Sequence, residues 1–310
     1  MTNGKICVLF ALIALSSNAC SDVVNSNNKL QAMLLTGQTN KYHNAEIMDR
    51  VLTAYLEETG LFDVTVVRSP AKGEDMSLFA PAFSDFDVVV SNYDGDAWPE
   101  ATKSAFVSYM RGGGGLVTVH STDNAFHDWP EWLEMTALGG WGDMDRGVIR
   151  DENWGPAVRW VDDGPELYDG PGKAFHPPPH DFVVTSRATE HPVMRGLPSE
   201  WLHAHDELYS MLRGPAQNMH VLATGFADPD AERASGYHEP AIFTVSYGEG
   251  RVFHTTLGHI PDEATEPTEA VRCIGFVTTI QRGAEWAATG DVTQPAPEVF
   301  PDATSTKLKN

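Results

Sequence analysis

The alternation of strand-like and helix-like segments in the first half of the chain constrains the fold most. Short apolar runs of the kind found in buried parallel strands occupy residues 29–36, 62–68, 86–91 and 116–120. Apolar residues at helical spacing predict helices over residues 44–59 and 99–111. Strand–helix–strand units form right-handed crossovers, so we expect an α/β domain with an open, mostly parallel sheet.

The second half of the chain predicts further strands and one long insertion. Residues 139–181 are rich in Gly, Pro, Trp and Asp, and we expect an ordered insertion near the functional site, with a short strand at 157–161. The remaining predicted elements are strands at 182–186 and 221–224, a hairpin of 241–247 and 251–257, and a helix over 268–287. We interpret residues 29–290 as one domain and 291–310 as a polar, proline-containing tail.

The N-terminus predicts export. Lys5 precedes an apolar run over residues 6–15, which is too short to span a bilayer, since a spanning helix needs about 20 residues. A basic start, a short apolar run and small residues before a cleavage site are typical of a secretory signal peptide, here residues 1–19.

Cys20 resembles a lipoprotein acylation site, although Ser17 stands where such sites usually carry Leu. Residues 20–28 are interpreted as a polar tether. We therefore expect a periplasmic protein or a lipoprotein that meets the membrane only through an anchor on Cys20. Signal cleavage without acylation, or a retained N-terminal segment, are the alternatives.

Charge and motifs exclude several classes of protein. The chain has 21 Lys and Arg against 43 Asp and Glu, a net charge of −22, which argues against nucleic-acid partners and against a basic lipid-binding patch. No Gly-x-Gly-x-x-Gly follows the first predicted strand, and Gly112–Gly115 precedes a strand, so no nucleotide cofactor is expected. After export only Cys273 would remain as a free thiol, which excludes a disulfide framework. A homo-oligomer remains open.

Histidines follow several predicted strands and form the candidate site. His43, His120 and His259 each come after a strand whose carboxyl end lies at the ligand-binding edge of such a sheet. His205 and Glu207 are two residues apart, so an extended segment would place them on one face. Imidazoles combined with a carboxylate suit Zn²⁺ or a similar divalent ion, and they also suit general acid–base catalysis.

Each candidate has a structural alternative. A loop histidine often only forms hydrogen bonds, and Asp206 with Glu207 could instead cap a helix or pair with Arg213. The His176-Pro-Pro-Pro-His180 segment is expected to be a rigid loop rather than a ligand pair. The sequence contains no Gly-x-Ser-x-Gly, and Ser121 is the one residue placed like an elbow nucleophile. His203 and His254 are expected to support the structure.

Four motifs in order resemble the ThuA-like, or trehalose-utilisation, family over about residues 29–290. They are Gly-Gly-Gly-Gly-Leu-Val-Thr-Val-His (112–120), His-Pro-Val-Met-Arg-Gly-Leu-Pro (191–198), Asp-Glu-Leu-Tyr (206–209) and Tyr-Gly-Glu-Gly-Arg-Val-Phe-His-Thr-Thr-Leu-Gly-His (247–259). The resemblance implies the class I glutamine-amidotransferase-like fold, a flavodoxin-like three-layer α/β/α sandwich. It also implies sugar catabolism, with trehalose-type disaccharides or their 3-keto forms as the substrate class.

The resemblance does not carry over glutaminase chemistry. True amidotransferases place a nucleophilic Cys after the strand that here ends in Val119-His120, where this chain has Ser121. Their late His-x-Glu corresponds here to Leu257-Gly258-His259.

The first functional hypothesis is an exported, metal-assisted hydrolase or lyase that acts on a glycoside or keto-sugar. Its expected metal ligands are His43, His120, His259 and Glu207. Its expected catalytic residues are Glu207 as ligand or base, His120, and Asp206, which would orient a histidine. Its expected substrate-binding residues are Asp123, Asn124, Trp141 and His205. The alternatives are a non-catalytic carbohydrate-binding lipoprotein and a serine hydrolase that uses Ser121.

Overall fold

The computed structural model describes Met1 and residues 29–143, 146–230 and 233–310. Residues 2–28, which comprise the whole predicted tether and all of the predicted signal peptide except Met1, lie outside the described residues. Within the described part of the chain, no helix has the length and apolar character needed to cross a membrane.

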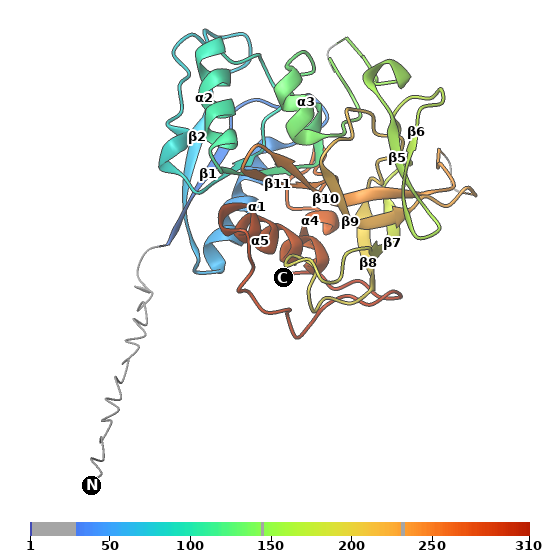
Figure 1. The fold of residues 1–310 in the computed structure, drawn as a ribbon. Helices are drawn as coiled ribbons and strands as arrows, with labels where there is room; N and C mark the ends of the chain where they lie inside the picture. Colours follow the sequence, from blue (N-terminus) through green and yellow to red (C-terminus); the bar gives the residue numbers. More distant parts are fainter. Residues whose placement is uncertain (2–28, 144–145, 231–232) are drawn as a thin grey trace.

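One half of the sheet is parallel, as the strand–helix alternation predicts (Figure 1). Its strands follow the order β2-β1-β3-β4, and all of these neighbours pair in parallel. The helices α1 and α2 connect successive strands, because apolar residues at helical spacing give each helix one buried face. The elements are β1 (Leu30–Thr36), α1 (Ala45–Glu58), β2 (Phe62–Arg68), β3 (Val88–Ser91), α2 (Glu100–Arg111) and β4 (Gly115–Val119).

The other half of the sheet is antiparallel, so the expectation of a mostly parallel sheet was wrong for this half. The strand β11 lies parallel to β4 and then pairs antiparallel with β10, and the order continues β9-β7-β8 with antiparallel neighbours. The turn at Gly248-Glu249 is too short for a crossover, which forces antiparallel pairing of β10 and β11. These strands are β7 (His180–Ser186), β8 (Glu200–Asp206), β9 (Met219–Phe226), β10 (His238–Tyr247) and β11 (Gly250–Thr255).

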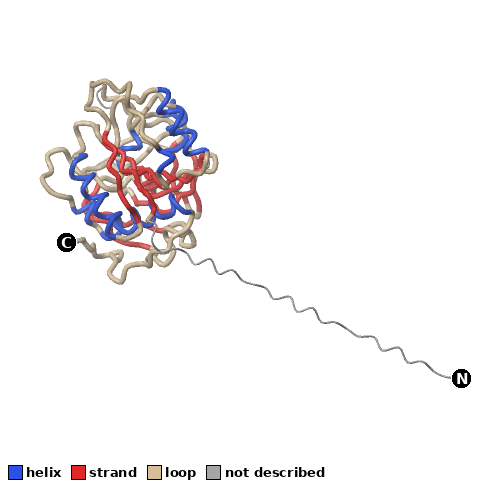
Figure 2. Tube along the Cα trace, turned by 90° about the vertical axis from the view of Figure 1, so that its left-hand side faces the viewer, coloured by secondary structure: helices blue, strands red, loops and turns tan. Residues whose placement is uncertain are grey.

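Helices cover both faces of the sheet (Figures 1 and 2). Alternate residues of β1 separate two apolar clusters: Ala32 and Leu34 pack on the side of α1 and α5, and Met33 and Leu35 pack on the side of α2 and α3. The helix expected over 268–287 is broken at Cys273, whose backbone is extended, with ψ 126°. The remaining helices are α3 (Pro130–Thr136), α4 (Glu269–Arg272) and α5 (Ile274–Thr289).

The described residues of the insertion after α3 are held by two fully buried arginines. Arg150 donates to the carbonyls of Trp141 (2.9 Å) and Asp123 (3.0 Å). Arg213 donates to the carbonyls of Tyr168 (3.0 Å) and Gly170 (2.9 Å). The insertion also contains the hairpin of β5 (Ala157–Val161) and β6 (Gly164–Tyr168). These hydrogen bonds to backbone oxygens tie an irregular segment to the sheet edge where the site lies.

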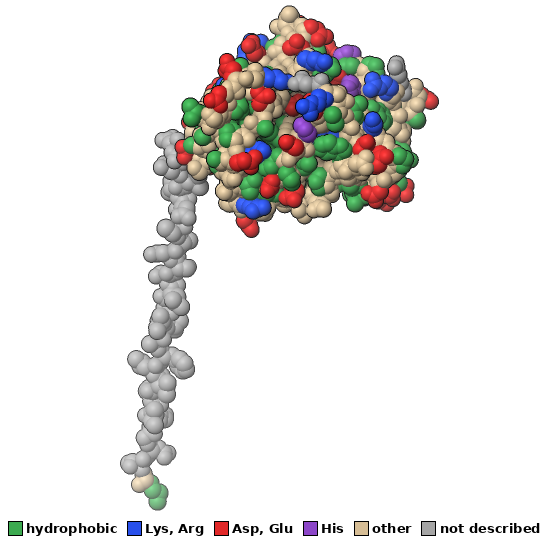
Figure 3. All heavy atoms as spheres, turned by 90° about the horizontal axis from the view of Figure 1, so that it is seen from above, with side chains coloured by type: hydrophobic (Ala, Val, Ile, Leu, Met, Phe, Trp, Pro, Cys, Tyr) green, Lys and Arg blue, Asp and Glu red, His purple; other side chains and the backbone are tan. Residues whose placement is uncertain are grey.

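Charged side chains of both signs share the face of the molecule seen in Figure 3. Lys and Arg side chains lie among Asp and Glu on this face.

Candidate functional site

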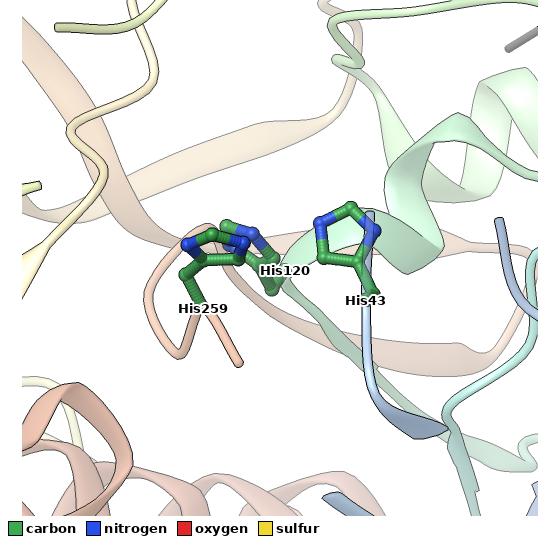
Figure 4. Close-up of side chains that lie close together, drawn as sticks. All are labelled: His43, His120 and His259. Carbon is green, nitrogen blue, oxygen red and sulfur yellow. The ribbon is translucent and has the colours of Figure 1, made fainter. Parts of the chain in front are cut away.

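Three histidines from separate loops meet at one edge of the sheet (Figure 4). His43 lies between β1 and α1, His120 directly follows β4, and His259 follows β11. One ring nitrogen from each histidine lies within 4.8 Å of the others. Because β1, β4 and β11 run in the same direction, their carboxyl ends bring these three predicted residues together.

The second ring nitrogen of each histidine faces an oxygen acceptor. The pairs are His43 Nδ1 with Asn40 Oδ1 (2.7 Å), His120 Nδ1 with the Thr256 carbonyl (2.7 Å) and His259 Nε2 with the Tyr42 carbonyl (3.4 Å). These acceptors favour a proton on the paired nitrogen of each neutral imidazole. The lone pairs of the neutral rings then lie on Nε2 of His43, Nε2 of His120 and Nδ1 of His259.

Burial keeps the three imidazoles neutral. Desolvation is the main cause that lowers the pKa of His43 well below its usual value, and the charges of the nearby histidines lower it further. Desolvation, followed by the charge of His259, lowers the pKa of His120 to about 3. Desolvation also lowers the pKa of His259. At neutral pH all three rings therefore carry a lone pair, which is the form that binds metal ions.

The Glu207 carboxylate lies among these rings. Its Oε1 is 3.3 Å from Nδ1 of His259 and 3.5 Å from Nδ1 of His176, and its Oε2 is 3.7 Å from Nε2 of His120. Desolvation, as the main cause, and the negative charge of Asp206, as the second, raise the pKa of Glu207 to about 8. A buried carboxyl with such a pKa can hold or release a proton near neutral pH.

Asp206 supports the loop that carries His259. Its carboxylate accepts hydrogen bonds from the backbone N–H groups of Gly258 (2.7 Å) and His259 (3.0 Å), and it lies 2.8 Å from Nε2 of His203. Although burial opposes the charged form, the hydrogen bond from His203 holds the pKa of Asp206 below its usual range. The alternative pairing of Asp206 with Arg213 does not form, because Arg213 donates to backbone carbonyls instead.

A cavity of about 490 Å³ opens beside Glu207 and His259. Trp141 lines it and packs edge-on against Tyr209, with ring centroids 4.9 Å apart. Asn124 also lines it, and its Oδ1 accepts hydrogen bonds from the N–H groups of Gly140 (3.1 Å) and Trp141 (2.8 Å). We call this cavity the histidine pocket. Its volume falls in the range of ordinary small-molecule sites.

Two of the expected sugar-binding residues lie outside the histidine pocket. Asp123 is fully buried, and its carboxylate is 3.8 Å from Nε2 of His254. His205 is exposed, and its backbone has a φ of 25°. This left-handed conformation breaks the alternation of an extended strand, so His205 does not share a face with Glu207 as expected.

Ser121 is buried and does not line the histidine pocket; it lines a separate small cavity together with Met48 and Asn92. An activated serine nucleophile requires a hydrogen bond from its hydroxyl to a base such as an imidazole. Among the described residues, the Ser121 hydroxyl forms no such bond.

Sequence reasoning missed two residues of the site. The Tyr209 hydroxyl lies 2.8 Å from Nε2 of His120. Tyr209 lies two residues after Glu207 in the sequence, a spacing that could have indicated that both side chains face the same way. His176, which was interpreted as part of a rigid loop, lies against Glu207 and lines the histidine pocket. No local pattern marks it, because the whole insertion must fold back to bring it there.

Comparison with known proteins gives one family match and several structural relatives. The sequence profile of the ThuA family, described as trehalose utilisation, matches residues 31–287. The chain is 44% identical to a putative ThuA-like protein from Parabacteroides merdae, covering 91% of this chain and 98% of that one with a TM-score of 0.85. A putative ThuA-like protein from Bacteroides uniformis is 17% identical, with 85% and 93% of the two chains covered and a TM-score of 0.54. No curated protein matches the sequence.

Proposed function

This chain belongs to the ThuA family of trehalose utilisation, and from that membership and its histidine cluster we propose that it is a metal-assisted sugar enzyme. The proposed reaction is hydrolysis or elimination on a glycoside or 3-keto-sugar of the trehalose type. We further propose that the protein is exported and held at the membrane by a lipid on Cys20. For the fold, we propose a flavodoxin-like, class I glutamine-amidotransferase-like sandwich that is extended by the antiparallel strands.

The observation that carries this proposal is the convergence of three neutral imidazoles beside Glu207. A catalytic zinc site typically uses three protein ligands and keeps one position open for water or substrate. The oxygen acceptors behind each ring are the partners that orient metal-bound histidines. A bound divalent cation would polarise a carbonyl or lower the pKa of a water molecule.

The chain's own residues have complementary proposed roles. Glu207 completes the ligand set or accepts a proton from the substrate, since its carboxylate lies beside the ligand nitrogens. Trp141 offers an aromatic face to a sugar ring, and Asn124 lines the same pocket. Asp206 positions His259 through the backbone hydrogen bonds of its loop.

Elemental analysis of the purified protein tests the metal site directly. We expect about one zinc or manganese ion per chain, lost in the His120→Ala and Glu207→Gln variants. His220→Ala is the matched control, because His220 is exposed at the start of β9 and outside the cluster. Retention of the ion in both site variants, or a parent protein that binds no metal from zinc- or manganese-containing buffer, would overturn the metal assignment.

Measuring sugar binding and product formation together distinguishes an enzyme from a non-catalytic carbohydrate-binding protein. Trehalose and its 3-keto form are incubated with the metal-loaded protein, and products are followed by mass spectrometry. We expect product formation that stops on chelation. Sugar binding that survives chelation, without product, would instead support a carbohydrate-binding protein. Labelling of Ser121 by a serine-directed phosphonate would support the hydrolase alternative.

A further inference from the structure

A second cavity adjoins the histidine pocket and has a different chemical character. Its volume is about 210 Å³, against about 490 Å³ for the histidine pocket. Three carboxylates line it, together with one lysine, one histidine and two asparagines; these are Asp94, Asp96, Asp143, Lys72, His127, Asn40 and Asn124. We call it the acidic cavity. It is smaller than ordinary small-molecule sites, which span about 300–1,000 Å³, so it fits a subsite better than an independent site.

The two cavities share one wall. Asn124 lines both of them. The segment of residues 40–43 contributes Asn40 to the acidic cavity and the next three residues to the histidine pocket. The start of the insertion also lines both cavities: Trp141 lines the histidine pocket, and residues 142–143 line the acidic cavity. A ligand with two linked parts can therefore contact both cavities across this wall.

Asn124 supplies a hydrogen-bond donor at the shared wall. The residue is 1% exposed, and its Oδ1 is occupied by the N–H groups of Gly140 and Trp141. Within the described part of the chain, no hydrogen bond uses its Nδ2. Because Asn124 lines both cavities, its amide nitrogen is placed to donate a hydrogen bond to an oxygen of a bound ligand.

The polar groups of the acidic cavity select for hydroxyl groups. A carboxylate accepts hydrogen bonds at both oxygens, and an ammonium or amide nitrogen donates them, so the lining suits a ring that carries several hydroxyls. The excess of carboxylates disfavours phosphorylated or otherwise anionic sugars, because like charges would be brought together. The aromatic lining of the histidine pocket, from Tyr42, Trp141 and Tyr209, instead suits the apolar face of a ring.

One side-chain amide connects the acidic cavity to the histidine cluster. Asn40 Nδ2 donates to Asp94 Oδ2 (2.7 Å), and Asn40 Oδ1 accepts from Nδ1 of His43 (2.7 Å). A ligand that contacts Asp94 therefore touches the same network that orients His43.

We propose that the acidic cavity is a second sugar subsite, which binds a neutral, hydroxyl-rich ring linked to the ring held in the histidine pocket. The substrate class is then a neutral two-ring glycoside rather than a single sugar. This inference rests on the proposed sugar function of the histidine pocket.

Ala97→Trp tests the subsite by filling it. Ala97 is exposed and lines the acidic cavity, so an indole there occupies space without disturbing the core. The matched control is Ala101→Trp, because Ala101 is exposed on α2 and lines neither cavity. Thermal melts verify that both variants are folded. Calorimetric titrations use zinc-loaded protein with trehalose, maltose, cellobiose and D-glucose as probes.

We expect at least one disaccharide to bind the parent protein about tenfold more tightly than D-glucose, a gain of about 1.4 kcal/mol. Ala97→Trp should abolish this advantage and leave D-glucose binding unchanged, whereas Ala101→Trp should change neither. An advantage that survives in Ala97→Trp, or a parent that binds D-glucose as tightly as every disaccharide, overturns the subsite and leaves the proposed pocket standing. A parent that binds none of the four sugars overturns both.

Discussion

The hydroxyl of Tyr209 donates a hydrogen bond to Nε2 of His120 across 2.8 Å. The direction follows from the other side of the ring, where Nδ1 must donate to the Thr256 carbonyl and the neutral ring can only accept at Nε2. Nε2 is also the nitrogen that a metal ion would need. The Tyr209 hydroxyl and a bound cation therefore compete for one lone pair.

Replacing Tyr209 with Phe should strengthen metal binding. The change removes one hydrogen bond from Nε2 of His120, and a net contribution of about 0.5–1.5 kcal/mol corresponds to an affinity gain of about 2- to 10-fold. Competition titrations with a chromophoric chelator measure the zinc affinity of both proteins. A weaker affinity in Tyr209→Phe would show that the phenol oxygen itself binds the ion.

Replacing Asp206 with Asn should weaken metal binding without touching a proposed ligand. In Asp206 one carboxylate oxygen accepts from the N–H of Gly258 and the other from the N–H of His259. The amide of Asn has only one oxygen, so one of these hydrogen bonds is lost and the loop that holds His259 loosens. Loss of such a supporting partner typically reduces metal affinity about 10- to 100-fold. The same titration measures it, with Asp63→Asn as the control, since the Asp63 side chain is 60% exposed. An unchanged affinity would limit Asp206 to a role in stability.

Local patterns predicted the parallel half of the sheet, because each strand and helix there is encoded by its own apolar period. They also predicted the meeting of His43, His120 and His259, since all three follow strands that run in the same direction. In the antiparallel half, the tight turn between β10 and β11 allowed that hairpin to be predicted, whereas the pairing of β7 with β9 joins strands that are not consecutive in the chain, which no local period records. The prediction that His205 shares a face with Glu207 was wrong, because the left-handed backbone of His205, and not its position in the chain, decides where its side chain points.

Arg150 should decide whether the insertion stays ordered. The Arg150→Met variant retains the apolar stem but leaves the carbonyls of Trp141 and Asp123 without their donor. An unpaired buried acceptor costs about 1–3 kcal/mol, so we expect lower stability and faster amide hydrogen exchange over residues 139–181. Exchange mass spectrometry locates the effect. Arg146→Met should leave exchange unchanged, because the Arg146 side chain is 83% exposed. Equal acceleration throughout the sheet would contradict a local role.

Glu239 should make the stability of the protein depend on pH. The carboxyl is buried, and it accepts a hydrogen bond from the N–H of Met211 (3.1 Å). Desolvation raises its pKa from 4.5 to about 7, although hydrogen bonds from Ser235 and Met211 and the charges of Arg159 and Arg213 oppose the shift. The folded state therefore binds the proton more tightly than the unfolded state, whose carboxyl titrates near 4.5.

The stabilising contribution of Glu239 is consequently complete below pH 4.5 and is lost as pH rises through about 7. Denaturant unfolding of the parent and of Glu239→Gln, measured at several pH values, isolates this group from all others. The neutral amide has no charge to bury, so the variant should gain stability relative to the parent as pH rises from 4.5 to 7. The gain approaches about 1.4 kcal/mol per pH unit at most, and it levels off above the folded pKa. A stability difference that stays constant across this window would show that Glu239 titrates alike in the folded and unfolded states.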